Sequence, residues 1–409
     1  MNMFFIHKRR EMLYNMRMKI GIYGGTFDPV HSGHIFVARS VKRELGLDRV
    51  DFVVAADPPH KHSEQRTPAA LRYEMVCAAL KNERGMSASD IEIRRGGISY
   101  TVETLRAIKR ANRKAALYFI VGADMLRDFP KWRAPGEILE LATLVGVNRR
   151  GQECDVLDTA KRITEEFGGR VEIVSAVGPN ISSTDIRRRV FEAQPVEELM
   201  PLPAEMLLYE KRLYQPKEIE RLAQRVAGVL DEYRMRHTML TVREAVGLAK
   251  FHGLSTEKAR LAALLHDCAK LGRAETVEYA EKMGYSLTDE ERANPFLIHS
   301  RIGALLARDV YGVQDSEILN AIERHTVGCA EMTPFDEVIF LADKLEPSRD
   351  YRRVRDLRAL AFKDLDSATI AVLKNTIEYV ENRDMSVHPQ TALTIAGLEK
   401  RVQERAAEQ

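Results

Sequence analysis

Short apolar runs alternate with longer amphipathic stretches over residues 18–215 of the chain. The runs predict strands at residues 19–23, 50–55, 116–121, 141–147 and 171–174. The stretches between them predict helices at residues 33–45, 66–81, 101–111 and 154–167. Strands that alternate with helices of this length are typical of a doubly wound α/β fold, a parallel sheet with helices on both faces. Ligands of such a fold bind outside the carboxyl ends of the strands.

Helical periodicity replaces the strand pattern from residue 216 onward. It predicts helices at residues 226–233, 240–251, 256–271, 276–283, 302–311, 315–323, 335–345 and 367–382. We therefore expect an α/β domain over residues 18–215, an all-α domain over residues 216–385, and a C-terminal helix that fades into a charged tail over residues 386–409. Residues 1–17 lack the apolar core of a signal peptide and are expected to form a disordered extension.

The composition narrows the functions open to these domains. The 409 residues carry 62 Lys and Arg against 60 Asp and Glu, a net charge of +2, which argues against a broad nucleic-acid-binding surface. The charge is uneven, because residues 1–215 carry +6 and residues 216–409 carry −4. No apolar run approaches the roughly 18 residues of a membrane span, and the four cysteines form no CxxC pair. We expect a reduced, cytoplasmic protein without a membrane or nucleic-acid partner.

The first candidate site is the string GGTFDPVHSGH at residues 24–34, which joins the first predicted strand to the first helix. Gly24 and Gly25 allow the backbone to approach an anion, and the free N–H groups of a helix start favour phosphate. His31 and His34 are three residues apart, so both rings face one side of the helix. They can donate hydrogen bonds to a polyphosphate. Taken alone, the string also fits a glycine turn with two solvated histidines.

The complete string resembles the HxGH motif of the nucleotidyltransferase superfamily, in particular of the nicotinate-nucleotide adenylyltransferase family. Four more segments resemble that family in the same order: PPHK at 58–61, SYTVETL at 99–105, GAD at 122–124 followed by Trp132, and ISSTDIR at 181–187. The resemblance covers residues 18 to about 214. A different HxGH adenylyl- or cytidylyltransferase, such as a pantetheine-phosphate enzyme, is the alternative, and Trp132 and the SYTVETL segment argue against it.

The resemblance implies that AMP passes from ATP to nicotinate mononucleotide, giving nicotinate adenine dinucleotide and pyrophosphate in NAD biosynthesis. Mg²⁺ is expected to be bound chiefly by the nucleotide. The implied catalytic residues are His31, His34 and Lys61, and Thr101 and Trp132 are implied to bind nicotinate. The implied ATP-binding residues are Gly24, Gly25, Thr26, Phe27, Gly33, Gly122, Asp124, Ile181, Ser182, Ser183 and Arg187. From the residues alone, Lys61 also fits an ordinary loop lysine and Trp132 a core residue.

The second candidate site begins with His266 and Asp267, adjacent on a predicted apolar helix, with Lys270 one turn past His266. Buried charge of this kind requires compensation, which a metal can supply. Candidate partners follow in order along the all-α half: His237, His299, His325 and Asp343. Nitrogen and oxygen donors of this kind suit Fe²⁺, Mn²⁺ or Zn²⁺. Each histidine by itself also fits a satisfied buried side chain.

The order of these residues resembles the HD phosphohydrolase superfamily. The segments RMRHT (234–238), ALLHDCAK (263–270), RHT (324–326) and FLADKLEPSR (340–349) resemble the branch that hydrolyses diadenosine tetraphosphate symmetrically into two ADP. One departure is HSRIG at 299–303, where that branch commonly has HGPxGA. The resemblance implies that His237, His266, Asp267 and Asp343 hold the core metal, His299 and His325 hold a second ion, and Lys270 contacts phosphate.

Together the two resemblances predict a bifunctional enzyme whose small-molecule substrates are ATP, nicotinate mononucleotide and diadenosine tetraphosphate. Two alternatives stay open for the all-α domain: a regulatory module that senses nucleotides, and a phosphohydrolase of another nucleotide. The oligomeric state stays open between a monomer and a homodimer.

Overall fold

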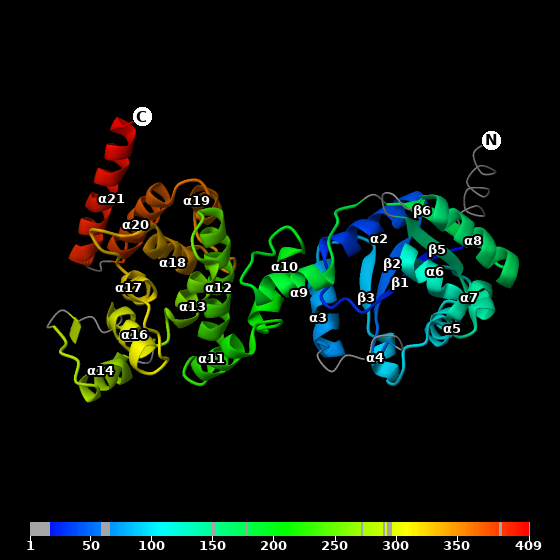
Figure 1. The fold of residues 1–409 in the computed structure, drawn as a ribbon, viewed down its shortest axis with the longest axis horizontal. Coiled ribbons are helices and arrows are strands. Elements are labelled where there is room, and N and C mark those ends of the chain that lie inside the picture. Colours follow the sequence, from blue (N-terminus) through cyan, green and yellow to red (C-terminus); the bar gives the residue numbers. More distant parts are fainter. Residues whose placement is uncertain are drawn as a thin grey trace, which may run out of the picture. The chain divides into compact units, whose positions relative to one another are not determined.

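A computed structural model describes residues 17–58, 66–148, 153–176, 178–270, 273–288, 291–292, 297–383 and 387–408. The chain packs as two compact units (Figure 1). The first contains the chain up to Ile186 and Glu198–Leu207, and the second contains Arg187–Glu197 and the chain from Leu208 onward. The expected boundary near residue 215 stays a prediction, since residues 187–197 and 208–214 group with the second unit by packing.

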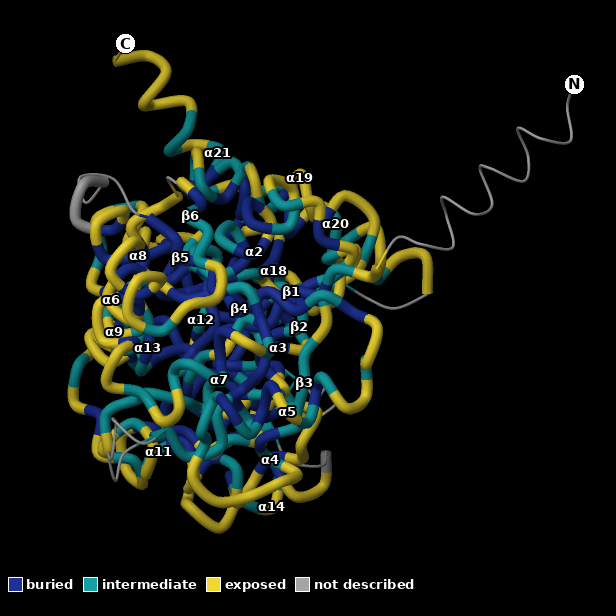
Figure 2. The backbone as a smooth tube through the Cα atoms, turned by 90° about the vertical axis from the view of Figure 1, so that its right-hand side faces the viewer, coloured by how far each residue is buried: buried dark blue, intermediate teal, exposed yellow. Residues whose placement is uncertain are grey.

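The first unit contains a parallel six-stranded sheet in the order β3-β2-β1-β4-β5-β6. Its strands are β1 (Lys19–Gly25), β2 (Arg49–Val54), β3 (Met86–Ser89), β4 (Ala116–Gly122), β5 (Thr143–Asn148) and β6 (Val171–Ser175). The apolar runs become strands because a parallel sheet between helices is buried on both faces, and Figure 2 shows the central strands mostly as buried backbone. The predicted doubly wound α/β fold is confirmed.

Helices connect the strands of this unit: α2 (Ser32–Glu44), α3 (Ala69–Leu80), α4 (Ile91–Arg95), α5 (Thr101–Ala111), α6 (Ala123–Asp128), η1 (Phe129–Lys131), α7 (Pro135–Leu141) and α8 (Glu153–Phe167). Apolar residues of α5, α6, α7 and α8 share one core with β1, β4 and β5, including Leu105, Leu126 and Ile138. Helices α9 (Ser183–Phe191) and α10 (Leu202–Glu210) each have residues in both units.

The described part of the second unit is helical, as predicted. Its helices are α11 (Lys217–Ala227), α12 (Glu232–Phe251), α13 (Thr256–Leu265), α14 (Arg273–Lys282), α16 (Ile298–Asp309), α17 (Ser316–Arg324), α18 (Pro334–Leu345), α19 (Val354–Ala361), α20 (Leu365–Glu381) and α21 (Pro389–Ala407). None of the helices in the described ranges is both long and apolar enough to cross a membrane.

Two predicted helices of this unit are wrong in their bounds. The stretch 226–233 is a junction, because α11 ends at Ala227 and Asp231 caps the start of α12 by accepting a hydrogen bond from the Arg234 N–H. The stretch 256–271 is helical only to Leu265. His266 and Asp267 therefore lie in the turn that follows α13, where the His266 Nδ1 bonds to the carbonyl oxygen of Ala263.

The C-terminal stretch is a docked helix over most of its length. The side chains of Thr391, Thr394 and Leu398 are buried on α21, and Arg401 reaches Glu337 of α18 and Asp366 of α20. The helix continues to Ala407, and Glu408 is its C-terminal cap.

Candidate active sites

The histidines of the first site stand at the start of α2. His31 caps the helix, and its backbone N–H donates to Nδ1 of His34 at 3.2 Å. The two rings stack with centroids 3.6 Å apart, and the His34 ring meets Phe27 edge-on at 5.0 Å. The expectation that both rings face one side agrees with this geometry. His31 is 3% exposed, whereas His34 is half-buried and reachable.

The glycine turn is closely packed against aromatic rings. A Cβ on Gly25 would lie 2.8 Å from the Phe27 ring, and a Cβ on Gly33 would lie 3.0 Å from Nδ1 of His31. Phe27 itself has a φ of 49°, a left-handed conformation that residues with side chains rarely adopt. Gly24 lies near the carboxyl end of β1, and Thr26 follows the strand directly. Only glycine fits at positions 25 and 33 without displacing these rings.

Arg72 on α3 holds this turn in place, and the sequence alone did not single it out. The guanidinium is 1% exposed and donates to three backbone carbonyls: Thr67 at 2.9 Å, Thr26 at 2.6 Å and Ala56 at 3.3 Å. These carbonyls come from the start of α3, the glycine turn and the end of β2. One buried side chain thus ties together the loops at the carboxyl ends of two adjacent strands.

The ISSTDIR segment forms the start of α9. The Ser182 hydroxyl accepts a hydrogen bond from the Asp185 N–H at 3.1 Å and so caps the helix. The Ser183 hydroxyl donates to the Pro29 carbonyl at 2.8 Å, so it binds the loop before His31, and Ile181 is buried. Arg187 belongs by packing to the second unit, and its part in ATP binding stays a prediction.

Trp132, implied to bind nicotinate, lies among aromatic side chains. It follows η1, with its ring 6.0 Å from Phe119 and 5.5 Å from Phe129. Its indole Nε1 is buried and donates no hydrogen bond to any described residue. Thr101 begins α5. Just before Thr101, Tyr100 packs under the guanidinium of Arg133, 4.5 Å from the ring centroid.

The remaining predicted residues of this site are spread more widely. Gly122 ends β4, and Asp124 in the first turn of α6 has an exposed carboxylate paired with Arg127. Lys61 falls outside the described residues. The roles assigned to all these side chains stay predictions.

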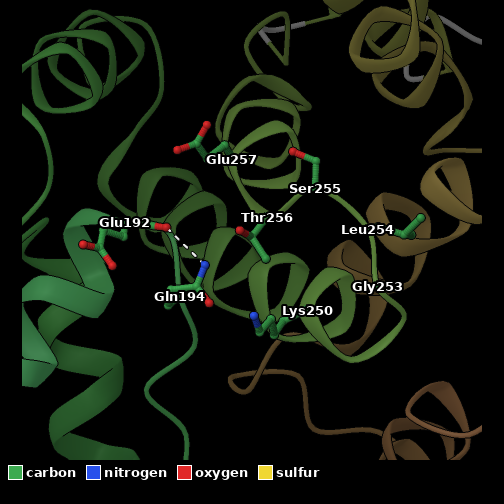
Figure 3. A pocket seen from close by; sticks show the side chains of 8 residues that line it. All are labelled: Glu192, Gln194, Lys250, Gly253, Leu254, Ser255, Thr256 and Glu257. Atoms are coloured by element: carbon green, nitrogen blue, oxygen red, sulfur yellow. Dashed lines mark hydrogen bonds between the residues drawn. The ribbon is translucent and has the colours of Figure 1, made fainter.

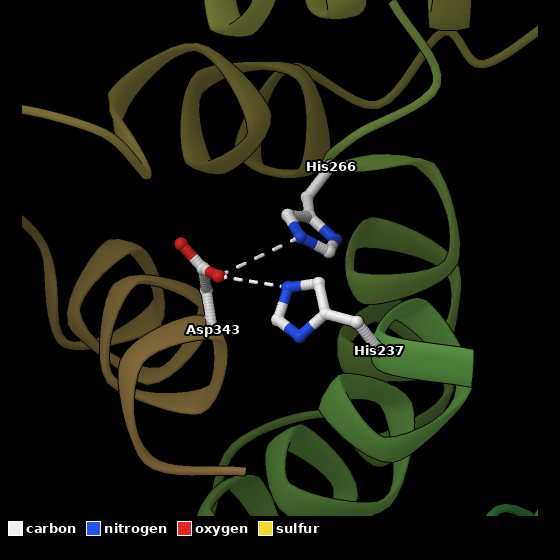
Figure 4. A group of neighbouring side chains, drawn as sticks. All are labelled: His237, His266 and Asp343. Atoms are coloured by element: carbon white, nitrogen blue, oxygen red, sulfur yellow. Dashed lines mark ion pairs between the residues drawn. The ribbon is translucent and has the colours of Figure 1, made fainter. Parts of the chain in front are cut away.

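In the second unit, six predicted side chains converge from five separate stretches of chain. His237 lies on α12, His266 and Asp267 follow α13, His299 lies on α16, His325 follows α17, and Asp343 lies on α18. All are between 0% and 7% exposed. We call this set the HD cluster. In Figure 4 the rings of His237 and His266 both point toward the Asp343 carboxylate, whose Oδ1 lies 2.9 Å from Nε2 of His237 and 4.0 Å from Nε2 of His266.

The carboxylate of Asp267 lies close to three histidines: His266, His299 and His325. Its Oδ1 lies 3.3 Å from Nε2 of His299 and 3.5 Å from Nε2 of His325, and its Oδ2 lies 3.6 Å from Nε2 of His266. Lys270 contacts the same carboxylate at 2.9 Å. Burial opposes ionisation of Asp267, but these neighbours hold its pKa well below the ordinary value. Two triads are close enough to share an ion: His237, His266 and Asp343, and His266, Asp267 and His325.

The HD cluster fits a metal for a reason visible in its hydrogen bonds. The Nδ1 atoms of His266 and His325 bond to the carbonyls of Ala263 and Ile322, each at 2.7 Å, so each Nε2 presents a lone pair when the ring is neutral. Burial favours that form, lowering the pKa of His266 to about 3 and lowering the pKa of His325. The buried Nε2 of His266 has no hydrogen-bond partner in the described chain. A divalent cation would satisfy it together with both carboxylates.

Three further side chains at this site were missed as individual candidates. Oε1 of Glu346 lies 3.3 Å from Nδ1 of His237 and so orients that ring. Nη2 of Arg349 lies 3.2 Å from Oδ1 of Asp343 and 3.4 Å from Nε2 of His237. Lys344 pairs with the other oxygen of Asp343. Two of the three are cations at the rim of an otherwise buried anionic site.

A surface hollow of about 360 Å³ lies elsewhere in the second unit, where the loop after α9 meets the connection between α12 and α13 (Figure 3). Its lining is Glu192, Gln194, Lys250, Gly253, Leu254, Ser255, Thr256 and Glu257. It contains no predicted site residue.

Each half of the chain is similar to a known protein family. Residues 22–189 match the family model described as cytidylyltransferase-like, and residues 234–348 match the HD domain model. The chain is 39% identical over 198 residues to a probable nicotinate-nucleotide adenylyltransferase of Clostridium botulinum, covering 98% of that protein and 48% of this chain. The chain belongs to the nicotinate-nucleotide adenylyltransferase family. An HD domain is fused to its C-terminal side, as the sequence predicts.

Other relatives cover the two halves separately. A probable nicotinate-nucleotide adenylyltransferase of Thermomicrobium roseum is 38% identical over 213 residues, which is 99% of that protein and 52% of this chain. A crystal structure from Clostridium acetobutylicum, described as a predicted HD superfamily hydrolase involved in NAD metabolism, is 36% identical with a TM-score of 0.43. The match covers 44% of this chain and 97% of that one.

Proposed function

We propose that the α/β domain is a nicotinate-nucleotide adenylyltransferase of NAD biosynthesis. The observation that carries the proposal is the stacked pair His31 and His34, which lies at a helix N-terminus beside the glycine turn in a chain of that family. A 5′-phosphate oxygen of nicotinate mononucleotide forms a bond to the α-phosphorus of ATP, while the bond from that phosphorus to the bridging oxygen breaks and pyrophosphate leaves. Both reactants supply their own nucleophile and leaving group, so the protein acts by alignment and charge stabilisation.

The side chains divide this work between the two substrates. His31 and His34 donate hydrogen bonds to the phosphates that become pyrophosphate, where negative charge accumulates. The α2 N-terminus and the glycine turn fix the triphosphate, and Arg72 fixes the turn. Trp132 and Thr101 receive the nicotinate ring. Mg²⁺ arrives with the nucleotide and neutralises part of its charge.

We infer that the HD domain hydrolyses a phosphoanhydride and that diadenosine tetraphosphate is its substrate. The supporting observation is the orphaned Nε2 of His266 between two buried carboxylates. A divalent transition metal, Fe²⁺ or Mn²⁺ by its donor set, would activate water and clamp phosphate there. His237, His266, Asp267 and Asp343 would hold the core ion, with His299 and His325 around a second. Lys270 and Arg349, which lie against the carboxylates of Asp267 and Asp343, would donate to phosphate oxygens.

Product analysis of the full-length protein tests both functions. With ATP and nicotinate mononucleotide, we expect nicotinate adenine dinucleotide and pyrophosphate in equal amounts. With diadenosine tetraphosphate and Mn²⁺ or Fe²⁺, we expect ADP alone, because symmetric cleavage of the tetraphosphate leaves two phosphates on each adenosine. AMP with ATP would contradict the symmetric assignment. No turnover of any nucleotide, together with tight nucleotide binding, would instead support a sensing domain.

A further inference from the structure

The chain is strongly basic just beyond the HD cluster. Helix α18 ends at Leu345, and residues 349–358 then carry five arginines against two aspartates, Asp350 and Asp356. Residues 216–409 as a whole carry 28 basic and 32 acidic residues. The positive charge is therefore local, and its placement needs a reason other than the average composition of the domain.

The base of this basic segment is anchored to the metal-ligating residues. Arg349 contacts Asp343 and His237, as described above. The Tyr351 hydroxyl donates to the Lys344 carbonyl at 3.1 Å. Arg358 closes the other side, with Nη2 donating to the carbonyls of Glu346 at 2.7 Å and Arg349 at 2.9 Å. The segment is thus held beside Asp343, Lys344 and Glu346 by contacts from both ends.

The tip of the segment carries three arginines that these contacts do not use. Arg352, Arg353 and Arg355 are exposed, and none forms an ion pair or side-chain hydrogen bond with the described chain. The Val354 N–H donates to the Tyr351 carbonyl at 3.1 Å, which closes a turn, and Arg353 has a φ of 68° in it. Because consecutive Cα atoms are 3.8 Å apart, the Cα of Arg352 lies within about 11 Å of the Cα of Arg349.

Cations at this position would weaken the hold of the cluster on a metal ion and strengthen its hold on an anion. Lys270, Lys344 and Arg349 already offset the buried carboxylates. Three additional guanidinium groups without acidic partners are suited to phosphate oxygens, which arginine binds with paired N–H donors. The remaining charge therefore points to an extended anionic ligand.

We propose that Arg352, Arg353 and Arg355 form a distal phosphate subsite, which takes the part of a polyphosphate chain that extends beyond the metal centre. The subsite selects substrates with a chain of several phosphates over a single phosphate ester. The inference rests on the proposed hydrolase function in one respect: substrate selection presupposes that a phosphoanhydride is cleaved at the HD cluster. Binding of polyphosphate to the three arginines is independent of turnover.

The test uses the full-length triple variant Arg352→Gln, Arg353→Asn and Arg355→Gln. Asparagine tolerates the left-handed backbone at position 353. The control variant, Arg308→Gln with Lys374→Gln and Lys400→Gln, removes the same charge from exposed sites on α16, α20 and α21. The first readout is modification of arginines by phenylglyoxal, mapped by peptide mass spectrometry with and without inorganic tripolyphosphate. This readout distinguishes the subsite from the ATP site of the other domain.

We expect tripolyphosphate to slow modification of Arg352, Arg353 and Arg355 at least fivefold and that of Arg308 not at all. In the second readout, the triple variant should raise KM for diadenosine tetraphosphate at least tenfold with kcat within twofold, and the control variant should leave both unchanged within twofold. Absent protection, an unchanged KM, or an equal effect in the control would overturn the subsite. Protection in a protein that hydrolyses no polyphosphate would support the subsite and contradict the proposed hydrolase.

Discussion

Nη1 of Arg72 donates to the carbonyl oxygen of Thr26 at 2.6 Å, from a guanidinium that is almost completely buried. The contact joins α3 to the glycine turn that precedes His31. The same side chain also donates to the carbonyls of Thr67 and Ala56. Loss of Arg72 therefore leaves three backbone carbonyls without this hydrogen-bond donor.

Arg72→Lys is accordingly expected to reduce the free energy of unfolding by about 2 kcal/mol or more, because an ammonium group cannot reach all three carbonyls. It should also raise KM for ATP at least tenfold by loosening the turn. Urea denaturation and steady-state kinetics measure the two effects. Arg110→Lys, at an exposed position on α5, is the matched control. A stable variant with an unchanged KM for ATP would show that the turn does not depend on Arg72.

His34→Ala is expected to lower kcat of adenylyl transfer at least a hundredfold, because a hydrogen-bond donor to developing charge is lost at the step where it matters. KM for nicotinate mononucleotide should change much less. The substitution also removes the Nδ1 acceptor of the His31 N–H, so His34→Asp, which retains an acceptor but has no N–H donor, separates the capping role from the chemical one. If His34→Asp kept kcat within a few-fold of wild type, His34 would have only the capping role.

Trp132 is the only tryptophan of the chain, so its fluorescence tests whether the indole belongs to the nicotinate site, as we propose. We expect nicotinate mononucleotide to quench that fluorescence in a saturable manner, because in the proposed function the nicotinate ring stacks on the indole. Trp132→Phe should raise KM for nicotinate mononucleotide about threefold to tenfold and leave KM for ATP unchanged, as expected for a weakened aromatic contact. Quenching by ATP alone would place the indole at the other substrate.

The parallel sheet could be predicted because its central strands are continuous apolar runs. The edge strand β3 could not, since its four residues, MSAS, contain a single large apolar side chain. Arg72 was missed for a different reason. An arginine in a helical pattern normally faces solvent, and its burial depends on carbonyls brought together from three distant segments.

The composition of the HD cluster could not be predicted from periodicity either. Periodicity predicted the helices but not that His237, His299 and Asp343 would meet, and their grouping came from a family resemblance. Periodicity also extended α13 past Leu265, because Cys268, Ala269 and Leu271 continue the apolar pattern. The helix ends at Leu265, and the His266 ring bonds to the Ala263 carbonyl in the turn that follows. A hydrophobic pattern does not record such a side-chain hydrogen bond.

Metal removal gives a direct prediction for the cluster. Protein purified without chelator should contain a divalent transition metal, and a chelator should lower its thermal stability. An ion present at a hundred times its Kd contributes about 2.7 kcal/mol. Asp343→Asn should reduce the bound metal, measured by mass spectrometry of the elements, at least tenfold. Asp309→Asn, an exposed aspartate on α16, should leave it unchanged. Equal metal content in the two variants would contradict the assignment of Asp343 as a ligand.

The docking of the C-terminal helix should depend on pH through Glu337. This carboxyl group is 1% exposed on α18, and Arg401 of α21 donates to it and to Asp366 of α20. Burial and the charge of Asp366 raise the pKa of Glu337 to about 8, against the opposing charge of Arg401. In the unfolded chain the same group titrates near 4.5. The folded state therefore binds an additional proton between these values.

The sign follows from that difference. The contribution of Glu337 to stability is complete below about pH 4.5 and is lost as the pH rises through 8, since an ionised Glu337 would be buried beside ionised Asp366. Between pH 5.5 and 8.5 we expect the opening free energy of α18 and α21, measured by amide hydrogen exchange, to fall by at most a few kcal/mol. Glu337→Gln should remove this dependence, because the amide is neutral throughout, whereas Glu378→Gln at an exposed position of α20 should preserve it. The same slope in wild type and Glu337→Gln would show that Glu337 is ionised in the folded protein at neutral pH.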